Sequence, residues 1–317
     1  MSDTDSPSVD YSVVMPVYFN EGSLTSTVDA LRSEVFDRQP SLRPEIVFVD
    51  DGSGDGSFDE LMRLRSAHPE LIRVIKLTRN FGQPAARLAG LSHSRGRCVI
   101  SMSADGQDPV ALINDMLRAH LDEGCQVVVC ARSGRDESWY RSFTSRVFYK
   151  LMRRMSFSNM PIGGFDYVLL GRAVVDVVLR NQDAQPFFQG QVLWTGFEPK
   201  FIPYHRLERR VGRSRWTFGK KLTLLIDGVL GYSFSPIRMI SLTGILVALF
   251  GFLFAILFVM RRLFFEVEIP GWSGIIVVVL VMGGVHMLML GVIGEYLWRT
   301  LAQVRGREPY VIETIYE

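Results

Sequence analysis

Two carboxylates stand close together in the stretch "ISMSADGQDP", at residues 100–109. Asp105 and Asp108, with Gln107 between them, follow an apolar run that is typical of a buried strand. Carboxylate and amide oxygens suit Mg²⁺ or Mn²⁺, and Mg²⁺ usually takes one or two carboxylates plus phosphate and water oxygens. We therefore expect Asp105 to hold a divalent metal ion. Asp108 has an equally good alternative, because an Asp directly before Pro109 fits a helix N-cap with Pro at the first helical position.

A second pair of acids, Asp50 and Asp51, stands in "VDDGSGDGS" at the end of another apolar run. An Asp in this position can accept hydrogen bonds from a nucleobase or a ribose. The glycines around it let the backbone approach a ligand closely. The alternative is an Asx-type turn, in which the acids serve only the turn.

Asp166 lies among glycines and aromatic residues in "GGFDYVLLGR". An acid there can act as a general base toward an attacking hydroxyl or orient a nucleophilic phosphate. The alternative is a solvated loop carboxylate.

A basic run, "RLERRVGRSRW", occupies residues 206–216. The guanidinium groups of Arg209, Arg210 or Arg215 can grip a phosphate in a bidentate manner. The same charges attract anionic lipids. These two roles are compatible.

Strands and helices must alternate to position these side chains. Apolar runs predict strands at 11–17, 45–53, 72–78, 98–104 and 126–132, and the spacing of apolar residues predicts helices at 22–36, 57–68, 84–94 and 110–124. This order predicts a mostly parallel α/β sheet with right-handed crossovers. Ligands bind such sheets at the carboxyl ends of the strands, and four polar loops, "PVYFNE", "DDGSGDGS", "RNFGQ" and "DGQDP", follow four of the strands. Their convergence on one edge is stronger evidence for a site than any single motif.

Composition limits the function classes. The chain has 317 residues, and its formal net charge of +2 gives no argument for a nucleic acid as a partner. Its three Cys residues form no C-x-x-C pair, so neither a structural zinc site nor a disulfide framework is expected. The N-terminus "MSDTDSPSVD" lacks the basic and apolar regions of a signal peptide, so the first half should stay on the synthesis side of any membrane.

Two long apolar segments predict membrane spans. Residues 239–260 carry no charge, and residues 272–294 carry none apart from the titratable His286, for which we expect an interhelical hydrogen bond. Each segment exceeds the roughly 20 residues that cross a bilayer core. Lys and Arg gather before the first span and after the second, which places both termini in the cytoplasm. The sequence therefore predicts an integral protein of the cell (inner) membrane whose globular domain is cytoplasmic.

The predicted organisation has five parts. Residues 1–10 form a disordered tail, 11–213 the α/β domain, 214–236 an amphipathic helix in the membrane interface, 237–298 the two spans, and 299–317 a cytoplasmic tail. The interfacial helix is expected because its segment is apolar on one side and basic at its start.

The motifs "VVMPVYFNE", "VDDGSGDGS", "RNFGQPAA", "SADGQDP", "RRVGRSRW" and "FSPIRMIS", followed by two spans, occur in one order. In this order the chain resembles the polyisoprenyl-phosphate glycosyltransferases of glycosyltransferase family 2, over residues 11 to 310. That group includes dolichyl-phosphate mannose synthase, the bactoprenol glucosyltransferases and the undecaprenyl-phosphate aminoarabinose transferase. The resemblance implies a GT-A fold and the inverting transfer of a sugar, expected to be UDP-linked, to undecaprenyl phosphate for cell-envelope glycans.

The resemblance also implies roles by position. The nucleotide sugar would contact Pro16, Tyr18, Glu21, Asp50, Asp51, Asn80 and Asp105. Asp105 and Gln107 would hold Mg²⁺ or Mn²⁺ with the donor diphosphate, and Asp166 matches the acid proposed as base or acceptor-orienting group. Arg209 and Arg215 match basic positions near the acceptor phosphate. Relatives form homo-oligomers, so the aromatic segment 139–157 is a candidate contact between copies.

Three positions depart from the pattern of this group. "PVYFNE" has one residue more than the usual "PVYNE", which makes the role of Glu21 less certain. Ser103 stands where most relatives have the first Asp of "DADLQ", and Gln189 stands where several have Arg. Fewer negative ligands compensate less of the cation's charge, so we predict metal dependence with weaker affinity rather than its loss.

Two other functions share some of these sequence features. A processive polysaccharide synthase would need a Q-x-x-R-W motif and more spans, but Val211 and Gly212 occupy the region where the Gln is required. A catalytically weak, membrane-tethered protein that binds sugar nucleotides is supported by Ser103 alone. Retention of Asp105, Gln107, Asp108 and Asp166 favours the enzyme.

Overall fold

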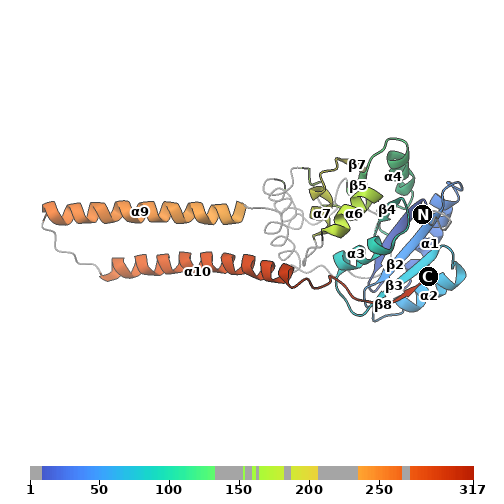
Figure 1. The fold of residues 1–317 in the computed structure, drawn as a ribbon, viewed down its shortest axis with the longest axis horizontal. Helices are drawn as coiled ribbons and strands as arrows, with labels where there is room; N and C mark the ends of the chain where they lie inside the picture. The colour runs from blue at the N-terminus through green and yellow to red at the C-terminus, as the bar shows by residue number, and fades with distance from the viewer. Residues whose placement is uncertain are drawn as a thin grey trace, which may run out of the picture. The chain divides into compact units, whose positions relative to one another are not determined.

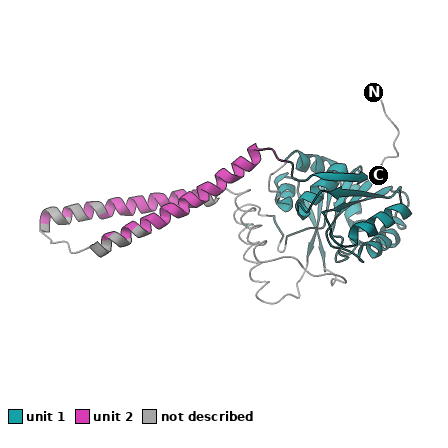
Figure 2. Ribbon diagram, turned by 90° about the horizontal axis from the view of Figure 1, so that it is seen from below, with its two compact units in different colours: residues 1–227, 308–317 teal, residues 228–307 magenta. Residues whose placement is uncertain are grey.

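The computed structural model describes residues 9–132, 153, 159–161, 164–181, 187–205, 235–265 and 272–317. The chain divides into two compact units, one of residues 1–227 with 308–317 and the other of residues 228–307 (Figure 2). Residues 1–8 of the predicted tail and residues 214–234 of the predicted interfacial helix lie outside the described part. The first unit contains the acids that the sequence singled out.

The first unit is built on an eight-stranded sheet with the order β7-β5-β6-β4-β1-β2-β3-β8 (Figure 1). Its strands are β1 (Tyr11–Val17), β2 (Pro44–Asp50), β3 (Ile72–Leu77), β4 (Cys98–Ser101), β5 (Val127–Arg132), β6 (Val168–Gly171), β7 (Pro199–Tyr204) and β8 (Ile312–Tyr316). The first four strands run parallel, as do β5 and β7, whereas β6 and β8 run antiparallel to their neighbours. The predicted mostly parallel α/β sheet is therefore confirmed.

Helices cover both faces of the sheet. They are α1 (Leu24–Leu31) with a π-helical turn η1 (Arg32–Phe36), α2 (Ser57–Ala67), α3 (Gln83–His93), α4 (Leu112–Leu121), α6 (Arg172–Arg180) and α7 (Phe188–Trp194). Successive strand residues point to opposite faces, and Met15 and Phe48 join one core with α1, α2 and α4. On the other face Val14 and Val49 meet α3 at Gly90, where a Cβ atom would clash with Val14. Because both faces are covered, the strands are continuous apolar runs.

Three strands were not predicted from the sequence. β6 begins two residues after Asp166, in a segment that we interpreted only as a loop with an acid. β7 follows α7, and β8 lies in residues that we assigned to a tail. β8 pairs with the outer edge of β3, so residues 312–316 are part of the sheet.

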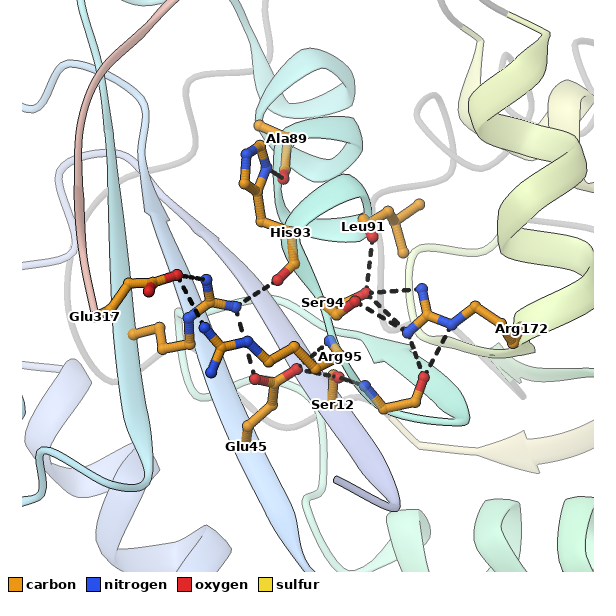
Figure 3. A network of polar contacts seen from close by, with 11 residues as sticks. Ser12, Glu45, Ala89, Leu91, His93, Ser94, Arg95, Arg172 and Glu317 are labelled. Carbon is orange, nitrogen blue, oxygen red and sulfur yellow. Dashed lines mark hydrogen bonds and ion pairs between the residues drawn. The ribbon is translucent and has the colours of Figure 1, made fainter. Parts of the chain in front are cut away.

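A polar cluster lies at the amino ends of β1, β2 and β3 (Figure 3). We call its members, Ser12, Glu45, Arg73, Arg95 and Glu317, the amino-end cluster. Glu45 Oε1 accepts hydrogen bonds from the Ser12 hydroxyl and the Arg95 backbone N–H, both at 2.5 Å. Arg73 and Arg95 both donate to Glu317 Oε1, at 2.5 and 2.9 Å. The cluster therefore fastens the residue after β8 to the starts of the central strands.

The second unit consists of two long helices, α9 (Ser235–Phe265) and α10 (Trp272–Val304). They contain 31 and 33 residues, and at about 1.5 Å per residue each exceeds the roughly 30 Å of a bilayer core. Segments Ile237–Phe254 and Val281–Val304 have mean hydropathies of 2.1 and 1.3 and are long and apolar enough to cross a membrane. The two predicted spans, 239–260 and 272–294, lie within these helices.

His286 lies on α10. The hydrogen bond given for its ring among the described residues is within the same helix, where Nδ1 lies 2.9 Å from the Met282 carbonyl oxygen, so the interhelical hydrogen bond stays a prediction. A polar side chain in an apolar helix can satisfy itself locally by bonding the carbonyl four residues earlier. The His286 ring therefore gives no sign of a site.

Candidate active site

The register of the sheet brings the predicted acids to one edge. Asp50 is the last residue of β2 and pairs with the last residue of β1, Val17. Asp105 follows β4, whose last residue pairs with the first residue of the antiparallel β6, so Asp166 lies at the same end. Arg132 and Tyr204 end the parallel strands β5 and β7. The carboxyl edge of the sheet thus collects residues from six strands or the loops beside them.

Asp51 holds the loop that follows β3. Its Oδ1 accepts the Phe81 N–H at 2.7 Å, and its Oδ2 accepts the Gly82 N–H at 2.9 Å. Gly52 makes this approach possible, because its φ is +68° and a Cβ atom there would lie 2.8 Å from the Arg79 carbonyl carbon. Burial raises the pKa of Asp51 to about 6, although the two backbone hydrogen bonds oppose the shift. Asp51 therefore fixes the loop that carries Asn80, and its contact with a nucleotide stays a prediction.

Asp50 has a different role from Asp51. The Ser53 N–H donates to its Oδ1 at 3.3 Å, while its buried Oδ2 has no hydrogen-bond partner among the described residues. Burial raises the pKa of Asp50, and the bonds from Ser53 lower it only in part. A buried acceptor oxygen without a partner is costly. Asp50 thus has one oxygen available for a donor group on a ligand.

The loop after β1 contains the extra residue of "PVYFNE". Phe19 has a φ of +57°, a left-handed conformation that costs energy in a residue with a side chain. Its ring meets the Tyr18 ring edge to face, with the centroids 4.7 Å apart. Asn20 Oδ1 accepts the Tyr18 N–H at 2.9 Å and closes the turn. Pro16 lies in β1 beyond the last residue paired with β4, so its missing N–H is tolerated.

Glu21 stabilises a helix. Its Oε2 accepts the Gly56 N–H at 3.1 Å, at the N-terminus of α2. Glu60 of α2 makes the reciprocal contact. Its carboxylate accepts hydrogen bonds from the Gly22 and Thr25 N–H groups, at 2.7 and 2.9 Å, at the start of α1. Burial alone would raise the pKa of Glu60, but these hydrogen bonds lower it overall. The two acids therefore position the loop between them, and direct binding of a nucleotide by Glu21 stays a prediction.

Asp105 and Gln107 form the candidate metal site. The Gln107 N–H donates to Asp105 Oδ1 at 3.2 Å across Gly106, and Asp105 is buried. Among the described residues, no three His, Cys, Asp or Glu side chains are grouped so that they could hold a metal ion. One carboxylate and one amide oxygen fit a divalent ion that takes its other ligands from phosphate and water.

The N-cap interpretation of Asp108 is wrong. Helix α4 begins at Leu112 after Ala111, and Pro109 to Ala111 form a turn before it. The carboxylate of Asp108 instead accepts the Ser103 N–H at 3.0 Å and the Tyr204 hydroxyl at 3.0 Å. Asp108 therefore shapes the metal loop from within and ties it to β7.

Asp166 is held from three elements. Arg132 at the end of β5 donates to its Oδ2 at 3.2 Å, and Gln189 of α7 donates to its Oδ1 at 3.2 Å. Arg87 of α3 lies 3.8 Å from the same Oδ1. The Asp166 side chain is nevertheless 32% exposed. We call these four residues the Asp166 cluster.

A polar chain joins the Asp166 cluster to the metal loop. Arg132 pairs in register with Tyr204, and their side chains interact. Burial alone would lower the pKa of Arg132. The interactions with Asp166 and Tyr204 outweigh this effect, so the pKa is raised overall. Tyr204 in turn donates to Asp108. The two parts of the edge are therefore one connected structure.

Sequence reasoning did not find Arg87, Arg132 or Tyr204. Arg132 could have been found, because it is a polar residue that ends an apolar strand at the carboxyl edge. Tyr204 gave no such signal, because its strand β7 was not predicted. Arg87 gave no signal, since an Arg within a predicted helix is usually solvated. Arg209 and Arg215 lie outside the described residues, so their role at the acceptor stays a prediction.

Residues 12–179 match the family described as Glycosyl transferase family 2. The chain belongs to glycosyltransferase family 2. It is 35% identical to the uncharacterized glycosyltransferase YkcC of Bacillus subtilis, over 97% of this chain and 94% of that protein. It is 30% identical to the SfII prophage-derived bactoprenol glucosyl transferase of Shigella flexneri, over 95% of this chain and 97% of that protein. The resemblance found in the sequence is therefore confirmed.

A solved structure, mannosyltransferase PcManGT from Pyrobaculum calidifontis in complex with GDP-Man and Mn²⁺, matches with 18% identity and a TM-score of 0.47. The match spans 64% of this glycosyltransferase and 58% of that chain. The family match and the observed sheet together confirm the predicted GT-A fold.

Proposed function

We propose that this glycosyltransferase moves a sugar from a nucleotide sugar, UDP-linked, to a polyprenyl phosphate, undecaprenyl phosphate, with inversion at the anomeric carbon. The observation that carries the proposal is the meeting of Asp50, Asp105 and Asp166 at one sheet edge in a family 2 chain. The relatives named bactoprenol glucosyl transferase, aligned over nearly the whole chain, support a polyprenyl phosphate acceptor.

The donor binds between the loops after β1, β2 and β3. Asp50 accepts a hydrogen bond from the nucleobase or ribose with its unpartnered Oδ2. Pro16, Tyr18 and the loop of Asn80 lie beside it, and Asp51 holds that loop in place through Phe81 and Gly82. The diphosphate lies at Asp105 and Gln107, which would hold Mg²⁺ or Mn²⁺. A bound divalent ion neutralises the charge that develops on the departing diphosphate.

The acceptor approaches from the opposite side of the sugar, near Asp166. A phosphate monoester is largely ionised at neutral pH, because its second pKa is about 6. Its oxygen therefore hardly needs a base, and Asp166 orients the acceptor or stabilises positive charge on the sugar ring. Arg209 and Arg215 bind the acceptor phosphate.

The two apolar helices anchor the protein in the cell membrane. The catalytic unit and both termini face the cytoplasm in this proposal, which the Lys and Arg residues that flank the two helices support through the positive-inside rule. The lipid acceptor and the enzyme then share one surface. Self-association through the 139–157 segment remains part of the proposal.

The test is sugar transfer to undecaprenyl phosphate in detergent, with a panel of nucleotide sugars and with Mg²⁺, Mn²⁺ or a chelator. Wild-type protein and Asp105→Ala are compared, and the anomeric configuration of the product is read by NMR. We expect one donor to give a metal-dependent product of inverted configuration. We expect Asp105→Ala to lose this activity by about 100-fold or more.

Two outcomes would contradict the proposal. Activity that is unchanged by a strong chelator would contradict the proposed dependence on a divalent metal ion. No product from any donor, while a uridine nucleotide still binds, would favour the catalytically weak binding protein, for which Ser103 would be the reason.

A further inference from the structure

Arg87 is a buried cation for which the proposed reaction has no task. It lies one turn into α3 and is 2% exposed. Its ion pair among the described residues is with Asp166, with 3.8 Å between Nη2 and Oδ1. The same Nη2 donates to the Asp166 carbonyl oxygen at 3.4 Å. The guanidinium carbon Cζ of Arg87 lies over the Phe188 ring, 4.4 Å from its centre.

Burying the charged guanidinium group of Arg87 has a desolvation cost that an apolar side chain at the same position would not have. Burial lowers the pKa of Arg87, and the charges of Asp166 and Asp108 oppose that shift. An arginine nevertheless keeps its charge at neutral pH. Replacing a buried ion pair by apolar residues is often neutral or stabilising, so stability gives no reason for a charge here.

The contacts of Asp166 suggest the reason. Arg132 donates a hydrogen bond to Asp166 Oδ2, while Arg87 of α3 and Gln189 of α7 approach Asp166 Oδ1. Without Arg87, that oxygen would keep one neutral donor, and the carboxylate could rotate toward Arg132. Helix α3 also begins directly after Gly82, which Asp51 holds on the donor side. Because Arg87 lies on α3, it links the position of the Asp166 carboxylate to the loop on the proposed donor side of the site.

We propose that Arg87 is a positioning residue that fixes the Asp166 carboxylate for sugar transfer, and that a cation placed at residue 189 can take over this task. The proposal rests on the proposed function for its catalytic consequence. The contact itself does not depend on that function.

The kinetic test uses Arg87→Met, which keeps an unbranched apolar side chain against Phe188. We expect kcat for sugar transfer to fall by about 10- to 100-fold, while KM for the nucleotide sugar changes little. Adding Gln189→Arg to this variant should restore most of kcat, because residue 189 reaches the same Oδ1. The matched control is Arg73→Met, which removes a buried arginine of the amino-end cluster. It should lower Tm, leave kcat per folded molecule near the wild-type value, and not respond to Gln189→Arg.

A thermal-unfolding cycle tests the contact without any activity. Asp166→Asn leaves Arg87 as a buried cation without the ion pair that it forms among the described residues, so the Tm of the variant should fall. Adding Arg87→Met should then raise Tm above that of Asp166→Asn alone. Additive losses would overturn the contact, whether or not the wild-type protein transfers sugar.

The two experiments separate the possible failures. A wild type that makes no product while the cycle shows coupling would contradict the proposed function and keep the contact. A kcat for Arg87→Met equal to wild type, or one that Gln189→Arg fails to restore, would overturn the positioning role.

Discussion

Two clusters of arginine and carboxylate side chains lie at opposite edges of the same sheet, one at the starts of β1, β2 and β3 and the other at the carboxyl edge beside β5 and β6. In the amino-end cluster the Glu45 side chain is 4% exposed and accepts two hydrogen bonds at 2.5 Å (Figure 3). In the Asp166 cluster the carboxylate is 32% exposed and its contacts measure 3.2 to 3.8 Å. Both carboxylates face buried arginines, yet one is enclosed and the other is open.

The difference in exposure distinguishes a cluster that stabilises the fold from a carboxylate that can take part in a reaction. Glu45, Ser12 and Arg73 connect the starts of three strands with the residue after β8, and the Glu45 and Arg73 side chains are buried. Asp166 is oriented by its partners but keeps access to solvent, as a group that meets a substrate must. Fully enclosed pairs specify structure, whereas an open, oriented carboxylate can also do chemistry.

A large effect is expected from disturbing the carboxyl edge without touching the amino-end cluster. Gly52→Ala adds a Cβ atom at a positive φ and 2.8 Å from the Arg79 carbonyl carbon, so the loop of Asn80 must move. We expect kcat/KM for the nucleotide sugar to fall by about 10- to 100-fold. Gly124→Ala is the control, because Gly124 has a φ of +74° with no atom within 4 Å. Equal losses in the two variants would assign the effect to backbone strain alone.

A smaller effect should follow from adding a charge to the metal loop. Ser103→Asp completes a D-x-D pair, so more negative charge faces the cation. We expect the Mn²⁺ concentration for half-maximal activity to fall on the order of tenfold. Ser103→Asn adds similar volume without charge and should change it little. If both variants behave alike, Ser103 is not beside the ion.

The sequence predicted the carboxyl edge better than the rest. Buried parallel strands are continuous apolar runs, so the polar residues that follow them, Asp50 and Asp105, mark the edge without a structure. The roles of Glu21 and Asp51 could not be read in this way. Their carboxylates hold backbone N–H groups of loops distant in sequence, at Gly56 and at Gly82, and such partners are visible only after folding.

Charged residues buried by tertiary contact were also hidden. Arg87 in "PAARLAGL" looks like the solvated position of an amphipathic helix, and only the approach of Asp166 and Phe188 explains it. β8 had a usable signal, since "VIETIY" is rich in the β-branched and aromatic residues that favour strands. Its position after two spans concealed that it belongs to the first unit.

The pH dependence of stability provides a third test of the carboxyl edge. Burial raises the pKa of Asp51 from 3.8 to about 6, so the folded protein binds this proton more tightly than the unfolded chain. Its contribution to stability is therefore complete below about pH 4 and is lost as the pH rises through 6. Asp51→Asn should flatten the change of Tm between these pH values. Parallel Tm profiles for the variant and the wild type would contradict the raised pKa.

The smallest expected effect concerns the link between the metal loop and β7. Tyr204→Phe removes the hydroxyl that donates to Asp108 at 3.0 Å. We expect a loss of about 1.5–3 kcal/mol in the free energy of unfolding, because the acceptor is charged. Tyr167→Phe is the control, since its hydroxyl donates at 3.2 Å to the neutral Pro109 carbonyl. A larger loss in Tyr167→Phe would show that the Asp108 link is not the stronger one.

The central claim is that the carboxyl edge carries out sugar transfer, whereas the amino-end cluster stabilises the fold. The most direct measurement compares Asp166→Asn with Glu45→Gln, each a change of carboxylate to amide, by turnover per folded molecule and by Tm. We predict that Asp166→Asn loses turnover by about 100-fold or more, while Glu45→Gln lowers Tm and keeps the turnover of its folded fraction. Equal turnover in the two variants would contradict the account.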